Sequence, residues 1–172
     1  MSGGRMIRTA READIPAMQQ IEVEAGRMFL PLEMHLVAED DPFSADELRE
    51  YLTDGRAWVS VDEADRPIAY ALVKWADDVA HLEQVSVDPA FAGRRLGVGL
   101  VERIAAWARE RGSPALTLTT FADVPWNAPY YERLGFRPLA DDEITPDLRA
   151  IRAEEAAHGL DRWPRLAMRR DL

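Results

Sequence analysis

The chain of 172 residues contains no cysteine, so a disulfide framework, a cysteine-ligated zinc site and a cysteine nucleophile are excluded. It also has no apolar run that approaches the roughly 20 residues needed to span a bilayer. No apolar signal segment follows Met1. We therefore expect a cytoplasmic protein that does not insert into a membrane.

Positive charge is also scarce, because 21 Lys and Arg residues face 31 Asp and Glu residues, for a formal net charge of −10. Affinity for nucleic acids depends largely on a basic surface, so we expect no nucleic-acid partner. Hydrophobic residues make up 47% of the chain and charged residues 30%, which is typical of a globular protein. The length predicts a single domain, 1–172, with a flexible leader at 1–5.

Hydrophobic periodicity and turn residues predict a mixed α/β (α+β) fold. Helices are predicted at about 14–27, 44–54, 97–111, 127–135 and 145–158, and strands at 6–9, 57–61, 67–75, 79–87, 115–121, 136–139 and 162–170. The strands within 57–87 should form an antiparallel meander. The strands at 79–87 and 115–121 should be parallel, since a helix connects them.

Two helix starts and one irregular segment complete this prediction. Asp14 and Ser44 have the side chains that cap helix N-termini. Residues 27–44 are rich in apolar side chains without a clear period, which predicts a folded loop that lines a site.

The most informative stretch is a glycine-containing turn between a strand and a helix. It reads Arg94, Arg95, Leu96, Gly97, Val98, Gly99. A P-loop would need Gly-Lys-Ser/Thr, and a dinucleotide fingerprint would need a third glycine where Glu102 stands. What remains is a helix start with two cations and small residues, where backbone N–H groups can bind a phosphate. The alternative to a phosphate site is that this stretch is only a glycine-containing turn that leads into a surface helix.

A second motif follows one strand later, where Asn127, Tyr131, Gly135 and Phe136 form Asn-x-x-x-Tyr-x-x-x-Gly-Phe. Together with the Arg-x-x-Gly-x-Gly of 94–99, it makes the chain resemble the GNAT superfamily of acetyl-CoA-dependent N-acetyltransferases. The resemblance covers roughly residues 6–139. It implies a mostly antiparallel central sheet whose one parallel strand pair splays apart, with flanking helices.

The resemblance also implies how acetyl-CoA would bind as the cosubstrate. The loop at 94–99 would hold the pyrophosphate, and the backbone of Val85 and Val87 would bond the pantetheine arm. Asn127 would act both as a helix N-cap and as a ligand of that arm. The N–H of Val87 would face the thioester oxygen.

Three residues are the candidates for catalysis: Tyr131, Glu83 and Val87. The family places a general acid where Tyr131 stands, next to the departing thiolate, and several members have a general base where Glu83 stands. A carboxylate near pKa 4.3 lies about 6 units below an alkylammonium, so Glu83 would act through water or merely attract the cation. His81 shares its strand face and is an alternative base. No metal site is predicted, since no histidine pair has ligand spacing.

The predicted function is acetyl transfer from acetyl-CoA to a primary amine, by direct attack and without a covalent enzyme intermediate. Two alternatives remain: a non-catalytic acyl-CoA-binding or sensor domain, and a modifier of an amine on a macromolecule. Residues 141–172 exceed the minimal family pattern. Their helix and strand would complete the sheet or pair with a second subunit, and we expect a homodimer.

Overall fold

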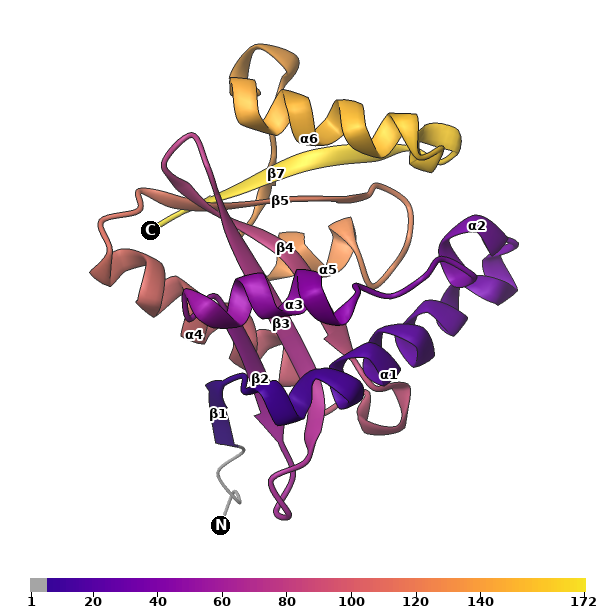
Figure 1. Ribbon diagram of the computed structural model, residues 1–172. Helices are drawn as coiled ribbons and strands as arrows, with labels where there is room; N and C mark the ends of the chain where they lie inside the picture. The colour runs from indigo at the N-terminus through magenta and orange to yellow at the C-terminus, as the bar shows by residue number, and fades with distance from the viewer. Residues whose placement is uncertain (1–5) are drawn as a thin grey trace. The chain divides into compact units, whose positions relative to one another are not determined.

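The computed structural model describes residues 6–172, so the predicted leader at 1–5 lies outside the described residues. The chain forms α-helices and β-strands whose order is drawn in Figure 1. The strands are β1 (Met6–Thr9), β2 (Ala57–Val61), β3 (Pro67–Ala76), β4 (Val79–Val87), β5 (Ala115–Phe121), β6 (Arg137–Pro138) and β7 (Arg165–Asp171). The helices are α1 (Ile15–Gly26), α2 (His35–Ala38), α3 (Ala45–Thr53), α4 (Leu96–Glu110), α5 (Ala128–Arg133) and α6 (Pro146–Ala157).

The strands form one seven-stranded sheet in the order β1-β2-β3-β4-β5-β7-β6. Its pairs β1/β2, β2/β3, β5/β7 and β6/β7 are antiparallel, whereas β4 and β5 are parallel. The predicted fold class, a mixed and mostly antiparallel sheet with one parallel pair and flanking helices, is therefore confirmed.

The chain divides into two compact units, which we describe separately. Of the described residues, unit 1 comprises 6–73 and 84–104, and unit 2 comprises 74–83 and 105–172. Strands β3 and β4 and helix α4 each begin in one unit and continue into the other.

The core of unit 1 forms between helices α1 and α3 and strands β2 and β3. Ile15, Met18 and Ile21 are spaced three residues apart, so they share one face of α1, and all three are buried. They pack in one cluster with Leu48 of α3 and with residues of the sheet such as Leu72. The amphipathic pattern of α1 is therefore what holds this helix on the sheet.

The two predicted helix caps differ. Ser44 caps α3 as predicted, because its Oγ accepts the Glu47 N–H at 3.1 Å and Glu47 Oε1 accepts the Ser44 N–H at 3.1 Å. Asp14 precedes α1, but the prediction that it caps this helix was wrong. No side-chain cap bond forms there, because the carboxylate is bound by residues that precede the helix.

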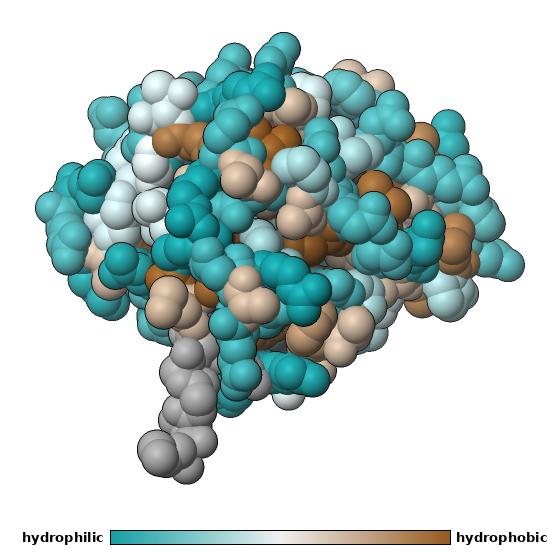
Figure 2. Space-filling view, turned by 60° about the horizontal axis from the view of Figure 1, so that its bottom comes forward, coloured by the Kyte–Doolittle hydropathy of each residue, from teal (hydrophilic) through white to brown (hydrophobic). Residues whose placement is uncertain are grey.

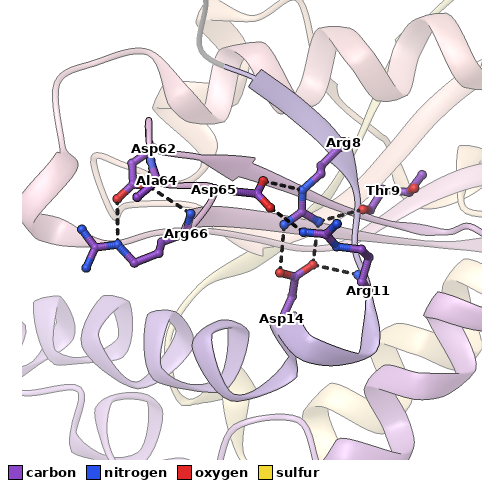
Figure 3. A network of polar contacts seen from close by, with 8 residues as sticks. All are labelled: Arg8, Thr9, Arg11, Asp14, Asp62, Ala64, Asp65 and Arg66. Atoms are coloured by element: carbon purple, nitrogen blue, oxygen red, sulfur yellow. Dashed lines mark hydrogen bonds and ion pairs between the residues drawn. The ribbon is translucent and has the colours of Figure 1, made fainter.

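Asp14 belongs to the polar network of Figure 3. Its carboxylate accepts two hydrogen bonds from the Arg8 guanidinium, at 2.7 and 3.0 Å, and one from the Arg11 N–H at 2.7 Å. Burial alone would raise the pKa of Asp14, but these donors lower it below its ordinary value. The Asp14 side chain is only 5% exposed, so the ion pair with Arg8 fixes the start of α1 against β1.

Residues 27–44 are more regular than predicted. They form a 3₁₀ helix, η2 (Arg27–Leu32), a left-handed residue at Glu33 with φ of 59°, and the single turn of α2. Local bonds such as Glu33 N–H to the Leu30 oxygen, at 2.9 Å, account for these turns. Leu30, Leu32 and Leu36 are about 40% exposed, and Figure 2 shows hydrophobic groups set among hydrophilic ones on the surface.

Unit 2 is built on the β5/β7 pair, which is in register from Ala115 opposite Asp171 to Phe121 opposite Arg165. The predicted closing strand begins at Arg165 rather than Arg162, since residues 160–162 form a 3₁₀ turn. β7 thus completes the sheet of its own chain. No helix among residues 6–172 is long and apolar enough to cross a membrane.

The Arg8–Asp14 pair yields a stability prediction. Replacing Arg8 with Met leaves the buried Asp14 carboxylate without its main partner, which should lower the free energy of unfolding by about 3 kcal/mol. The matched control is Arg66→Met, because Arg66 pairs with Asp62 while its side chain is 79% exposed. That change should cost less than about 1 kcal/mol. Urea unfolding at pH 7 measures both, and equal losses would contradict the role given to Asp14.

Candidate active site

In unit 1, a tight loop leads from the end of β4 into helix α4. The Asp88 carboxylate accepts the Ala90 N–H at 3.0 Å, which starts the 3₁₀ turn η3 (Pro89–Phe91). Gly93 and Arg95 then take left-handed backbone angles, with φ of 79° and 58°. The left-handed region suits glycine but costs Arg95 roughly 1 kcal/mol or more, so this conformation is a strained one.

The loop delivers three backbone donors at the start of α4. The first bond of the helix runs from the Gly99 N–H to the Arg95 oxygen at 3.1 Å. The N–H groups of the three residues before it, Leu96, Gly97 and Val98, therefore lack an acceptor inside the helix. These donors and the helix dipole favour an anion at this end.

Arg94 and Arg95 add positive charge at the same place. Both side chains are exposed, and neither pairs with a carboxylate of residues 6–172. The Arg94 guanidinium lies over the Phe91 ring, 5.1 Å from its centroid, which orients it. Glycine at position 99 has a packing reason, because a Cβ there would lie 3.3 Å from Ile7 Cδ1. Gly99 is thus explained by packing against β1.

The end of β4 in unit 1 contains the predicted thioester edge. Val85 and Val87 are half-buried and Ser86, between them, is buried, as strand alternation requires. The Asp88 N–H that follows bonds the Ile68 oxygen of β3 at 3.0 Å. Nothing in the structure tests the predicted contact of the Val87 N–H with a thioester, so this role stays a prediction.

In unit 2, the parallel ladder between β4 and β5 is two residues long. It pairs Ala80 with Leu116 and His81 with Thr117. Leu82 and Glu83 continue β4 with no β5 partner, although β5 itself continues to Phe121. The unpaired edge of β5 leaves backbone groups open for an extended ligand.

Glu83 is paired with a residue that the sequence analysis missed. Lys74 Nζ lies 2.9 Å from Glu83 Oε2. Burial raises the pKa of Glu83, and Lys74 opposes this rise. The signal was present in the hairpin: Asp77 and Asp78 both have positive φ, at 52° and 63°. Counting outward from such a two-residue turn sets Lys74 diagonal to Glu83.

His81, the alternative base, is deeply buried in unit 2. Its Nδ1 bonds Thr117 Oγ1 at 2.9 Å, and its side chain is 1% exposed. Burial, helped by the charge of Lys74, lowers the pKa of His81 to about 3. The imidazole is therefore neutral at pH 7, and its Nε2, 3.9 Å from Glu83 Oε2, forms no ion pair there. Burial makes His81 a weaker base than an exposed histidine, and the alternative that it shares or replaces the role of Glu83 stays a prediction.

Tyr131 lies on α5, also in unit 2. Its ring packs edge-on against Phe136, with the centroids 5.7 Å apart. The Phe136 N–H donates to the backbone carbonyl oxygen of Tyr131 at 3.1 Å. Gly135, with φ of 94°, makes this return possible. Burial raises the pKa of Tyr131 well above its ordinary value, so the hydroxyl is protonated at pH 7. It donates to no acceptor within residues 6–172.

Asn127 stands at the N-cap of α5 but does not cap it through its side chain, which corrects half of the prediction. Its φ and ψ of −111° and −115° aim the amide elsewhere, and Nδ2 donates to the Trp126 oxygen at 3.2 Å. Asn127 Oδ1 is buried and has no hydrogen-bond partner within the described residues. A buried acceptor without a donor is costly, so it fits an N–H group brought by a ligand.

The comparisons with known proteins agree with this geometry. A model of the Acetyltransferase (GNAT) family matches residues 16–136. The chain is similar to the peptidyl-lysine N-acetyltransferase YjaB of Escherichia coli (strain K12), at 26% identity over 122 residues, or 71% of this chain and 73% of that protein.

Two solved structures show the same fold at low sequence identity. One is Rv2747 from Mycobacterium tuberculosis in complex with CoA and NLQ, with a TM-score of 0.70, 20% identity and coverage of 97% of this chain and 99% of that one. The other is the ribosomal-protein-S18-alanine N-acetyltransferase from Escherichia coli, with a TM-score of 0.65, 21% identity and coverage of 97% and 93%. Since the family match spans more than half of the 172 residues, the chain belongs to the Acetyltransferase (GNAT) family.

Proposed function

We propose that this protein transfers the acetyl group of acetyl-CoA to a primary amine by direct attack in a ternary complex. The observation that carries the proposal is the start of α4, where three N–H groups without an acceptor in the helix adjoin two unpaired arginines in a chain of net charge −10. Such a site suits a pyrophosphate. The complex of Rv2747 with CoA supports the same ligand.

The rest of acetyl-CoA would be held by Asn127 and by the backbone at the end of β4. Asn127 Oδ1, buried without a partner, suits an amide N–H of the pantetheine arm. The backbone of Val85 and Val87 would bond the arm as a neighbouring strand does. Acetyl-CoA supplies the activated acyl group, and the protein supplies position and a donor for the oxyanion, for which we propose the Val87 N–H.

Tyr131 is the proposed general acid. Its hydroxyl keeps its proton at pH 7 and has no other acceptor within the described residues, so it is free to donate to the departing thiolate. A thiol has an ordinary pKa near 8.5, so a strengthening hydrogen bond, rather than complete transfer, is the expected contribution. We assign no catalytic role to the neighbouring residue, Tyr130.

Glu83 is the proposed general base, acting through water. Its pairing with Lys74 keeps the carboxylate ionised despite burial, while burial makes it more basic than an exposed Glu. For the acceptor we propose a lysine side chain of a peptide, because YjaB, a similar protein, is a peptidyl-lysine N-acetyltransferase. A sensor domain would need CoA affinity but neither Tyr131 nor Glu83.

The α4 site is tested by removing its cations. Arg94→Ala combined with Arg95→Ala should raise the Kd for CoA about tenfold or more, since a loss of 1.4 kcal/mol is tenfold. Calorimetry at low and moderate salt measures it, and the wild type should lose affinity more steeply with salt than the variant. Arg103→Ala, an exposed change on the same helix, is the control. Unchanged affinity in the double variant would refute the pyrophosphate site.

The role of Tyr131 is tested by Tyr131→Phe, which keeps the ring that packs on Phe136. We expect kcat to fall about 100-fold, the lower range for general acid catalysis, with the Kd for CoA changed less than about twofold. Thiol release from acetyl-CoA over a panel of amines gives kcat. Tyr130→Phe is the matched control and should retain turnover. A Tyr131→Phe enzyme with wild-type kcat would remove the assignment.

The role of Glu83 is tested by the pH profile. Lys74 lowers the pKa of Glu83, so Lys74→Met should raise that pKa further. Because the base must be ionised, the acidic limb of kcat/KM should move to higher pH, whereas Lys74→Arg, which keeps the charge, should restore it. An acidic limb that stays in place, or moves to lower pH, would show that Glu83 is not the titrating base.

A further inference from the structure

A second carboxylate, in unit 1, is built differently from Glu83. Glu22 lies on α1 and is half-buried. Its Oε1 accepts the Tyr70 hydroxyl at 2.7 Å and the Phe43 N–H at 3.3 Å. One donor comes from β3 and the other from the residues that precede α3, so the carboxylate is fixed by two elements besides its own helix.

The donors behind Glu22 form a directed chain that leads to the thioester strand. Gln84 Nε2 donates to Ser86 Oγ at 2.7 Å, and Ser86 in turn bonds the Tyr70 hydroxyl, whose proton is given to Glu22. Tyr70 is fully buried and Ser86 is 4% exposed. Every donor in this chain points toward Glu22. Burial raises the pKa of Glu22, and the bond from the Tyr70 hydroxyl opposes that rise. Ser86 stands between Val85 and Val87 on β4.

The other oxygen of Glu22 is free. Both bonds go to Oε1, and Oε2 accepts none from the described residues. Oε2 is also not among the fully buried atoms without a partner, so it keeps some contact with solvent. The charged groups that face Glu22 are Asp40 and Glu47, both acidic, and no Arg or Lys of residues 6–172 pairs with it. Within residues 6–172, the charge of this carboxylate therefore has no cationic partner.

We propose that Glu22 is a specificity residue whose Oε2 binds a second cationic group of the acceptor, one that stays charged while another amine reacts. The proposal rests on the acetyl-transfer function above. A half-buried charge without a counter-ion is costly, and an ammonium offers three donors to satisfy it. The attacking amine must lose its charge, whereas a carboxylate whose Oε2 accepts no bond from the described residues is suited to a group that keeps its charge. The acceptor class is therefore a dicationic amine or a lysine beside another basic residue.

The test compares acceptors that differ only in the second cation. The pairs are pentane-1,5-diamine against pentylamine, and a lysine peptide flanked by arginines against the same peptide flanked by glutamines. The wild type should prefer the dicationic member about tenfold or more in kcat/KM, and Glu22→Gln should bring the ratio near one. Glu24→Gln is the matched control, because it removes the same charge from α1 while Glu24 is already paired with Arg27 at 3.1 Å. It should keep the preference.

A binding measurement separates this proposal from the function on which it rests. Calorimetry of the CoA-saturated protein with pentane-1,5-diamine should show about tenfold weaker binding in Glu22→Gln and no change in Glu24→Gln. A wild-type protein that does not bind CoA, or that releases no thiol with any acceptor, would refute the acetyl-transfer function. Intact turnover with equal diamine binding in the wild type and Glu22→Gln would refute the role of Glu22 alone.

Tyr70→Phe tests the positioning of the carboxylate. It keeps the buried ring but removes the hydroxyl that lowers the pKa of Glu22, so that pKa should rise. As the pH falls and Glu22 protonates, the preference for the diamine should vanish, and in Tyr70→Phe it should vanish at higher pH. A merely structural Tyr70 would change stability without moving this pH dependence. An unmoved midpoint would therefore overturn the assignment of Tyr70 as a positioning residue.

Discussion

The short parallel ladder between β4 and β5 is the constraint on which the site in unit 2 depends. Two residue pairs, Ala80 with Leu116 and His81 with Thr117, join the strands, and the bond between the His81 and Thr117 side chains lies at the last of them. β5 is held along its whole length by β7, so its position does not rely on β4. A strand fixed on one edge can leave the other edge open without a loss of order, which is what an extended ligand requires.

The two carboxylates show how environment separates similar side chains. Glu83 has its counter-ion 2.9 Å away in Lys74, the only lysine of the chain. Glu22 is bound by neutral donors through one oxygen, and among residues 6–172 the charged groups that act on it, Asp40 and Glu47, are acidic. Burial raises the pKa of both Glu83 and Glu22. The first is a compensated charge suited to proton transfer through water, and the second is an open charge suited to binding a cation.

Much of the fold follows from local sequence. Strands 6–9, 57–61, 79–87 and 115–121 match their predicted bounds, and Ser44 caps its helix, because alternation, turn residues and a capping box act over a few residues. Asp14 has the same cap chemistry but is taken by Arg8, whose approach depends on how β1 and α1 fold together. The irregular composition of 27–44 hid a run of short helical turns, whose bonds span three or four residues and leave no long period.

The candidate site divides in the same way. Its motif residues could be found in sequence because backbone geometry requires glycine or a helix start at fixed spacing, as at Gly135. The partners that set their chemistry were harder to find. Lys74 can be placed near Glu83 only once the two-residue turn at 77–78 is recognised. Tyr70 reaches Glu22 from 48 residues away, so that contact exists only after the sheet forms. The same reason hid the packing of Gly99 on Ile7, which gives that glycine a structural role apart from any ligand.

The charge of the protein then has opposite consequences for the two proposed ligands. A net charge of −10 repels a polyanion such as CoA at long range, so the pyrophosphate must be held by contacts at close range, where salt screens least. Arg94, Arg95 and the N–H groups of α4 act over such distances. A cationic acceptor is attracted by the whole chain and needs only one fixed carboxylate to set its register. Added salt should therefore slow the approach of the acceptor by screening the field of the whole protein. It should weaken the binding of CoA by screening the contacts with the loop at 94–99.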